Sequence, residues 1–191
     1  MTTSHAVAAE GHDPAHTVRM NRFGLWLFFI SDGLIFALLL ASRFYLAGVD
    51  TPHDVSQVLG LAMTSLLLFS SLTAYRAETS IAHGNIAAGR RMLLVTAVLG
   101  TLFLGGVMME WGLAEFSVSE AYGTAFFSMT GMHAGHVASG VLLLLLARRQ
   151  AGVGRYDGGG TRAWGASGIV MYWHFVDVIW VFFYPALYLL R

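Results

Sequence analysis

The sequence predicts an all-α fold, an integral membrane bundle of five transmembrane helices. Hydrophobic residues make up 56% of the 191 positions and charged residues only 12%, which is about half the charged share of a typical soluble protein. A soluble domain with so few charged residues could not cover its apolar surface. Five apolar segments are each close to the roughly 20 residues that a helix needs to cross a bilayer. None of them alternates between polar and apolar residues as the strands of a membrane barrel do.

The charge balance and the absence of cysteine exclude further classes of protein. Eleven basic residues, all arginine, balance eleven acidic residues, so the formal net charge is zero. No excess of positive charge draws this chain toward nucleic acid. Because the sequence contains no cysteine, disulfide bonds, thiolate metal sites and covalent haem attachment are excluded.

The first element covers residues 23–46 and follows a polar tail, residues 1–22. A cleaved signal peptide would have an apolar region of only about 7–15 residues and a cleavage site of small residues. We therefore expect the first span to be retained. It begins a membrane domain that covers residues 23–191.

The other four spans follow at short intervals along the chain. The stretches between them carry charges, glycine or proline, as in residues 48–52 and 155–160. We find no internal repeat and no boundary that would indicate a second domain. The expected spans are residues 57–75, 92–111, 123–146 and 167–190.

The positions of the arginines predict how the bundle is oriented. Cytoplasmic loops of membrane proteins carry an excess of Lys and Arg. The tail, the second loop and the fourth loop share one side of the membrane and hold nine of the eleven arginines: Arg19, Arg22, Arg76, Arg90, Arg91, Arg148, Arg149, Arg155 and Arg162. The opposite side holds Arg43, Arg191, Asp50, Asp54, Glu115 and Glu120. We expect the N-terminus in the cytoplasm and the C-terminus outside.

Ionisable residues inside the spans are the candidate functional residues, because such groups are costly in a bilayer. At about 1.5 Å per residue they lie about 10–21 Å from the cytoplasmic ends of three helices, which puts them in one layer. Glu110, about 27 Å along its span, is expected at the outer interface, where water can solvate it. The members of this polar layer are Asp32, His133, His136, His174 and Asp177.

The residues alone leave several roles open for the polar layer. A carboxylate beside a histidine can be a hydrogen-bonded pair that fixes helix register, a step in proton movement, a subunit contact or part of a metal or haem site. On the fifth span, residues spaced three and four apart share one face of the helix. That face cannot be exposed to lipid, because it contains Asp177. That face therefore turns toward the bundle or a partner protein, and it consists of His174, Asp177, Val181, Tyr184 and Tyr188.

Small residues at four-residue spacing line the first and fourth spans. Such stripes let neighbouring helices approach closely, so we expect both to lie in helix contacts. The two stripes are Gly33, Ala37 and Ala41, and Gly131, Gly135 and Ser139.

Three ordered motifs resemble those of haem-copper oxidase subunit III in its five-helix bacterial form. Residues 24–37 read GLWLFFISDGLIFA and are similar to the family's opening helix. Residues 130–137 read TGMHAGHV, and residues 172–180 read YWHFVDVIW, like two further family signatures. Glu110 and Trp111 also fit, and the resemblance covers nearly the whole chain from residue 23.

The resemblance implies a non-redox core subunit of a terminal respiratory oxidase, which reduces oxygen to water and pumps protons. The chain itself would hold no catalytic, cofactor-binding or metal-binding residue; haem and copper would lie in partner subunits. It would pack directly on subunit I, belong to a complex with subunit II and other small subunits, and bind phospholipid. It would support proton uptake and the durability of the active site, with the family's first-helix carboxylate at Asp32. The implied location is the bacterial cytoplasmic membrane.

Other functions remain open at this point. The electron donor of the complex can be cytochrome c or quinol. A related accessory protein accompanies nitric-oxide reductases. A small membrane cytochrome would need histidines from two helices, and His133 and His136 lie on the same one. A proton-coupled transporter would be expected to show inverted repeats and broken helices, and we find no such repeat.

Overall fold

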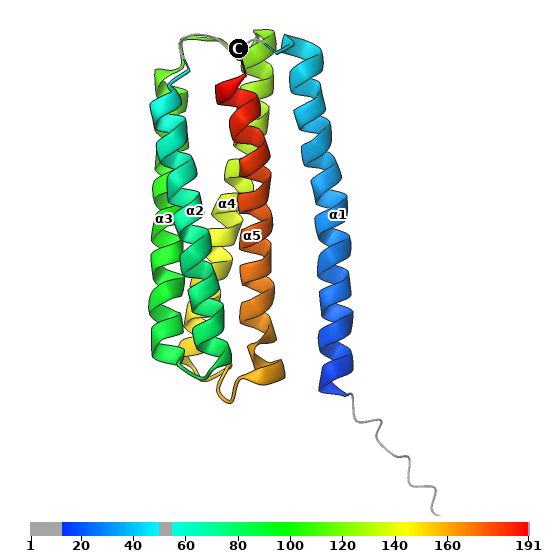
Figure 1. Cartoon of the computed structure of the whole chain (residues 1–191), viewed down its shortest axis with the longest axis vertical. Helices are drawn as coiled ribbons and strands as arrows, with labels where there is room; N and C mark the ends of the chain where they lie inside the picture. Colours follow the sequence, from blue (N-terminus) through cyan, green and yellow to red (C-terminus); the bar gives the residue numbers. More distant parts are fainter. Residues whose placement is uncertain (1–12, 50–54, 191) are drawn as a thin grey trace, which may run out of the picture.

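The computed structural model describes residues 13–49 and 55–190, which form five long antiparallel helices (Figure 1). Within these residues no strand is present. All five helices are long and apolar enough to span a membrane, which confirms the predicted fold class. The helices are α1 (Pro14–Ala47), α2 (Gln57–Ala82), α3 (Ile86–Leu113), α4 (Ala121–Gly152) and α5 (Trp164–Tyr184), with the short elements η1 (Gly160–Ala163) before α5 and η2 (Pro185–Leu189) after it.

Helix α1 begins well before the expected span at residue 23. The side chain of Asp13 accepts a hydrogen bond from the backbone N–H of Ala15 at 3.0 Å, and Pro14 follows in the first turn. Both residues favour a helix start. The segment expected as a polar tail is therefore helical from Pro14 onward. Residues 1–12 lie outside the described residues, as do Asp50, Asp54 and Arg191 from the orientation argument.

Helices α2 to α5 form a four-helix core around Trp173. Helix α2 packs on α3 and α5, and α4 packs on α3 and α5. Trp173 is fully buried and lies over Gly100 of α3 and Gly140 of α4. A Cβ atom at Gly140 would come within 2.8 Å of the Trp173 ring, so the glycine is what lets the ring fit.

Indole and hydroxyl groups join the core helices to one another. Trp173 Nε1 donates to Ser70 Oγ at 2.9 Å, and Trp180 Nε1 donates to Thr64 Oγ1 at 3.0 Å, so two bonds connect α5 to α2. Trp111 Nε1 of α3 donates to Thr130 Oγ1 of α4 at 3.0 Å. These bonds satisfy buried donors that lipid could not.

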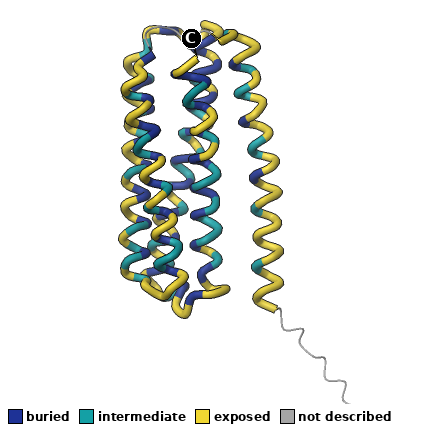
Figure 2. The backbone as a smooth tube through the Cα atoms, viewed as in Figure 1, coloured by how far each residue is buried: buried dark blue, intermediate teal, exposed yellow. Residues whose placement is uncertain are grey.

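Helix α1 lies at the edge of the bundle, against α4, α5 and η1 (Figure 1). Most of its residues are exposed, in contrast to those of the core (Figure 2). Its main anchors are aromatic. The ring of Phe29 stacks on Phe175 of α5 at a centroid distance of 4.8 Å, and Phe36, 2% exposed, contacts the rings of His136 and Phe183.

The small-residue stripes make the expected helix contacts only in part. Gly33 does face Phe175, but Ala37 and Ala41 are exposed. A Cβ at Gly135 would have no neighbouring atom within 4 Å. Gly131 lies against Trp111 of α3, and Ser139 Oγ is 2.7 Å from the Tyr172 hydroxyl of α5, so the fourth-span stripe meets neighbouring helices at two positions. At Gly100 and Gly140 a large indole rather than a second helix backbone fills the space.

The end of the chain after α5 is a π-helical turn, η2. It begins at Pro185, and the N–H of Leu190 donates to the Pro185 carbonyl at 3.2 Å. On the predicted polar face Tyr188 is buried and its ring stacks on that of Tyr184, whereas Val181 is 47% exposed.

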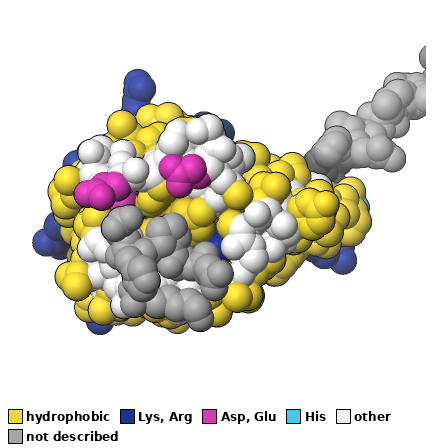
Figure 3. All heavy atoms as spheres, turned by 90° about the horizontal axis from the view of Figure 1, so that it is seen from above, with side chains coloured by type: hydrophobic (Ala, Val, Ile, Leu, Met, Phe, Trp, Pro, Cys, Tyr) yellow, Lys and Arg dark blue, Asp and Glu magenta, His cyan; other side chains and the backbone are white. Residues whose placement is uncertain are grey.

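The two ends of the bundle differ in charge. The nine arginines of the tail, second loop and fourth loop lie at the end of the bundle where α1 and α5 begin. We call this end the arginine-rich end. The opposite end carries the exposed carboxylates of Glu115 and Glu120, and acidic side chains are visible on it in Figure 3.

Candidate functional site

Asp32 of α1 and His136 of α4 form an ion-pair contact. Asp32 Oδ2 lies 3.1 Å from His136 Nε2, and the side chains are 13% and 19% exposed, respectively. The other ring nitrogen of His136, Nδ1, lies 2.9 Å from the carbonyl oxygen of Met132. A carbonyl oxygen can only accept, so Nδ1 carries a hydrogen.

The contact is an ion-pair distance and not a formed hydrogen bond, because Asp32 Oδ2 has no hydrogen-bond partner among the described residues. It brings two ionisable side chains together at the seam where α1 meets the core.

His174 and Asp177 lie at a different seam, between α5 and α2. His174 Nδ1 is 2.7 Å from Ser71 Oγ of α2. Ser71 also lies beside the Asp177 carboxyl, but its hydrogen bond joins His174. Asp177 is 5% exposed, and neither of its carboxyl oxygens has a hydrogen-bond partner in the described part of the chain. An ionised Asp177 would thus lack a compensating group among these residues.

His133 is an aromatic member of the core. It is fully buried, with ring centroids of Phe103 at 5.6 Å and Trp180 at 4.9 Å. Neither ring nitrogen has a hydrogen-bond partner among residues 13–49 and 55–190. Its contacts are those of a packing residue.

The predicted polar layer is therefore divided into three separate places. Asp32 and His136 meet, His174 and Asp177 share the α2–α5 seam, and His133 lies among rings of α3 and α5. The residues described by the structure include no group of three His, Cys, Asp or Glu side chains placed to hold a metal ion. Sequence reasoning missed Ser71, which looks like any other serine in an apolar span.

Glu110 is not solvated as expected. It is 6% exposed, and the hydroxyl of Tyr188 donates to its Oε2 at 2.6 Å. The same end holds Arg43, fully buried, whose Nη1 donates to the Gly48 carbonyl at 2.7 Å and whose guanidinium lies 4.9 Å from the Tyr122 ring centroid. An arginine within an apolar span was the sequence signal for this polar cluster.

Comparison with known proteins identifies relatives along almost the whole chain. The family model described as cytochrome c oxidase subunit III matches residues 3–190. A cytochrome c oxidase subunit 3 of Alkalihalophilus pseudofirmus is 33% identical, with 93% of each chain covered. One of Thermostichus vulcanus is 31% identical over 87% of this chain and 86% of its own. One of Papio hamadryas is 32% identical over 94% of this chain and 73% of its own.

Proposed function

This chain belongs to the cytochrome c oxidase subunit III family, and on that premise we propose that it is the non-redox third subunit of a haem-copper respiratory oxidase. The complex reduces oxygen to water and pumps protons. Haem and copper lie in its other subunits, and no residue of this chain carries the redox chemistry.

The observation that carries this proposal is the family match over residues 3–190. The geometry agrees with it, because the three motifs of the sequence meet in space. Asp32 of the first motif contacts His136 of the second. Phe29 of the first motif stacks on Phe175 of the third.

We propose that the Asp32–His136 pair has a structural role first and a role in proton uptake second. It is the one ion pair found among residues 13–49 and 55–190, and it joins α1 to the core. Both ionisable side chains are partly exposed, so each is within reach of water or of a partner subunit.

The remaining parts of the proposal concern surroundings and partners. The chain lies in the bacterial cytoplasmic membrane with its arginine-rich end in the cytoplasm, as the excess of arginine there favours. It packs directly on subunit I, in a complex with subunit II and small subunits, and binds phospholipid. Exposed apolar residues along α1, such as Leu34 and Leu38 at 62% and 71%, provide surface for these contacts.

Cytochrome c is the electron donor that we propose for the complex, rather than quinol. The relatives described above are named as subunits of cytochrome c oxidase. Those names also favour an oxidase over a nitric-oxide reductase. A haem ligand role for His136 or His174 is disfavoured, because their contacts go to Asp32, Met132 and Ser71.

Purification of the full chain from its native membrane in mild detergent tests the proposed function. We expect a haem-copper subunit in equal amount and oxidation of reduced cytochrome c by the purified complex. Oxidation of quinol alone would correct the donor. A stoichiometric haem absorbance from the isolated chain would instead identify a cytochrome and overturn the proposal.

A further inference from the structure

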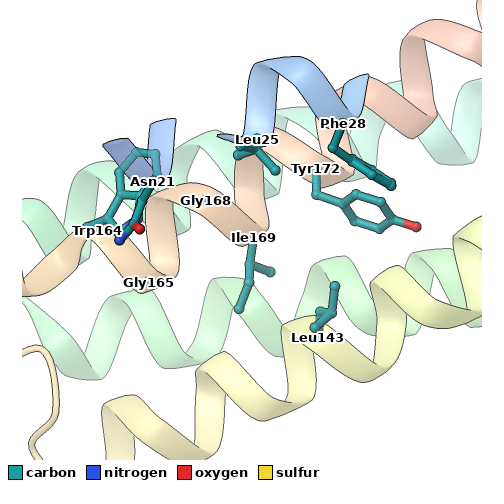
Figure 4. A pocket seen from close by; sticks show the side chains of 9 residues that line it. All are labelled: Asn21, Leu25, Phe28, Leu143, Trp164, Gly165, Gly168, Ile169 and Tyr172. Carbon is teal, nitrogen blue, oxygen red and sulfur yellow. The ribbon is translucent and has the colours of Figure 1, made fainter. Parts of the chain in front are cut away.

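Two cavities of the bundle differ in the kind of residue that lines them. One, of about 470 Å³, lies between α1, α4 and α5, and none of the residues that line it is charged (Figure 4). The other, of about 30 Å³, lies at the end opposite the arginine-rich end, between the start of α2 and the end of α3, and Glu110 lines it. We call this second space the Glu110 cavity. It is large enough for one water molecule or one small ion.

One carboxyl oxygen of Glu110 is buried without a partner. Glu110 is 6% exposed, and its Oε2 accepts a hydrogen bond from the Tyr188 hydroxyl at 2.6 Å, whereas its Oε1 has no hydrogen-bond partner in the described part of the chain. No ion pair to Glu110 is present within residues 13–49 and 55–190. A buried carboxylate that lacks a compensating group is costly.

The Glu110 cavity also lies at the C-terminal end of α3. The last carbonyl groups of a helix have no partner within it and carry its partial negative charge. No backbone hydrogen bond from the described residues ends on the carbonyl oxygens of residues 111–113, and the last turn of α3 has no basic residue. Leu113 and Ala114 line the cavity. The carboxyl group of Glu110 is therefore placed where the helix is already negative.

Ser56 adds a hydroxyl to this set of oxygens. It lines the cavity and caps α2, where its Oγ accepts a hydrogen bond from the Leu59 N–H at 3.3 Å and keeps a second lone pair. Carboxylate and carbonyl oxygens are the ligands that hard cations take in proteins, and helix C-terminal ends coordinate sodium in membrane transporters. The exposed Glu115 and Glu120 make the surface of this end acidic, which attracts cations (Figure 3).

We propose that the Glu110 cavity binds one sodium ion. Glu110, the Ser56 hydroxyl and carbonyl oxygens at the end of α3 coordinate the ion, and water completes its shell. The terminal torsion of a glutamate is soft, so the carboxyl can turn its free oxygen toward the cavity without movement of α3. One positive charge balances one carboxylate, whereas a divalent ion would add an excess charge to an end of the bundle that already contains the buried Arg43.

The proposal implies that sodium and a proton exchange at Glu110. Without sodium, charge balance in the cavity requires a proton on the carboxyl group. Each sodium ion that binds therefore releases one proton to the solvent. The bound ion joins the start of α2 to the end of α3. The proposed function does not use this part of the molecule, so the two proposals are independent.

Infrared difference spectroscopy of the full-length protein, purified with its partners in mild detergent, tests the proposal. Choline chloride is exchanged for sodium chloride at constant ionic strength. We expect sodium to remove the carbonyl absorption of a protonated carboxylic acid and to raise that of a carboxylate, with saturation as its concentration increases. A pH indicator in weakly buffered solution is expected to report one proton released per chain.

Two variants of Glu110 and one matched control identify the site. Glu110→Gln removes the charge and is expected to abolish the response to sodium. Glu110→Asp keeps the charge on a shorter side chain and is expected to need about tenfold more sodium, which keeps the test decisive if Glu110→Gln does not assemble. Glu115→Gln is the control, because Glu115 is exposed at the same end and does not line the cavity. It is expected to respond like the unaltered protein.

Other occupants of the cavity give different results. A spectrum that does not change with sodium shows that the cavity holds only water or that Glu110 keeps its proton, and it overturns the proposal. A response that remains unchanged in both Glu110 variants arises elsewhere in the complex and also overturns it. A response to calcium at lower concentration than to sodium would reject the assignment to a monovalent ion. Oxidation of cytochrome c by the same preparation tests the proposed function separately.

Discussion

Helices α1 and α3 are equally apolar in their most hydrophobic stretches, yet they are packed very differently. In those stretches 11% of the α1 residues are buried within the protein, compared with 33% in α3. Helix α3 lies within the four-helix core, whereas α1 lies at its edge. Hydropathy predicts which segments enter a membrane, but lipid is as apolar as leucine, so it does not predict which segments pack together.

What distinguishes the core is the kind of contact between its helices. There, indole N–H groups reach hydroxyl groups on neighbouring helices, as Trp173 reaches Ser70 and Trp180 reaches Thr64. The attachment of α1 rests on ring contacts and on the Asp32–His136 pair. The core is thus fixed at several buried points, and α1 at few, partly exposed ones. Four predictions address this difference.

Replacing Trp173 by alanine is expected to have the largest effect. It empties the space between Gly100 and Gly140 and leaves Ser70 without its donor, at a cost of about 3–5 kcal/mol in the free energy of unfolding. Trp26→Ala, on the 53% exposed Trp26 of α1, is expected to cost less than about 0.5 kcal/mol. Reversible unfolding in mixed detergent micelles measures both. Equal costs would remove the distinction between core and edge.

Alanine substitutions at two glycines of α4, five positions apart, are expected to change the stability in opposite directions. Gly140→Ala forces a Cβ against the Trp173 ring and is expected to destabilise by about 1–3 kcal/mol. Gly135→Ala meets no atom within 4 Å and is expected to stabilise the helix by about 0.5–1 kcal/mol. Thermal unfolding of the two variants checks the difference. A stabilised Gly140→Ala variant would show that Trp173 is not tightly held.

Replacing Asp32 is expected to loosen α1 without affecting the core. Asp32→Leu leaves His136 Nε2 without its partner, which costs about 1–3 kcal/mol. Asp32→Asn keeps the shape and a polar group beside His136, and is expected to leave assembly and neutral-pH turnover nearly unchanged. Because the chain has no cysteine, labels on introduced cysteines in α1 and α5 can report the separation of the two helices.

Turnover measured against pH separates the two roles of Asp32. A loss of turnover in Asp32→Asn at high pH, where protons are scarce, with assembly intact, would show that proton relay comes before structure. An Asp32→Leu complex that assembles and turns over like the parent would reject both roles.

The smallest effect is expected at the aromatic contact between α1 and α5. Phe175→Leu removes the stacking with Phe29 and is expected to weaken α1 docking by about 0.5–1.5 kcal/mol. Phe182→Leu, on the 61% exposed Phe182 of the same helix, is expected to have no measurable effect. The distance between the same labels is the readout, and a larger effect at Phe182 would place α1 elsewhere.

The sequence was sufficient to predict the five helices, and it placed Asp32 in one layer with three histidines without deciding which of them Asp32 meets. Depth in a membrane can be counted along a helix, so two residues at equal depth could be recognised as potential partners. Counting residues does not, however, show which neighbouring helix each face of a helix packs against. Ser71 pairs with His174 because α2 packs against α5 at this position, and nothing in a serine inside an apolar span indicates this.

The environment of Glu110 could not be predicted because it depends on an irregular turn. A regular helix would continue the 3–4 spacing of α5, but η2 widens the helix after Pro185. That turn brings Tyr188 to Glu110 and the Leu187 carbonyl to the Tyr122 hydroxyl, 2.7 Å away. Counting residues along regular helices predicted a solvated Glu110, whereas the irregular turn η2 places Tyr188 against it.

The position of α1 also determines the order in which the molecule can be completed during its synthesis. Of the five helices described, α1 precedes the others in the chain, but its contacts lie with α4, α5 and η1, which come last. At about 5–20 residues per second, more than 100 residues separate it in time from α5, a delay on the order of ten seconds. Over that interval the nascent α1 lacks the helices against which it packs in the folded protein. Among these five helices, the one that is synthesised earliest is therefore the last to be docked.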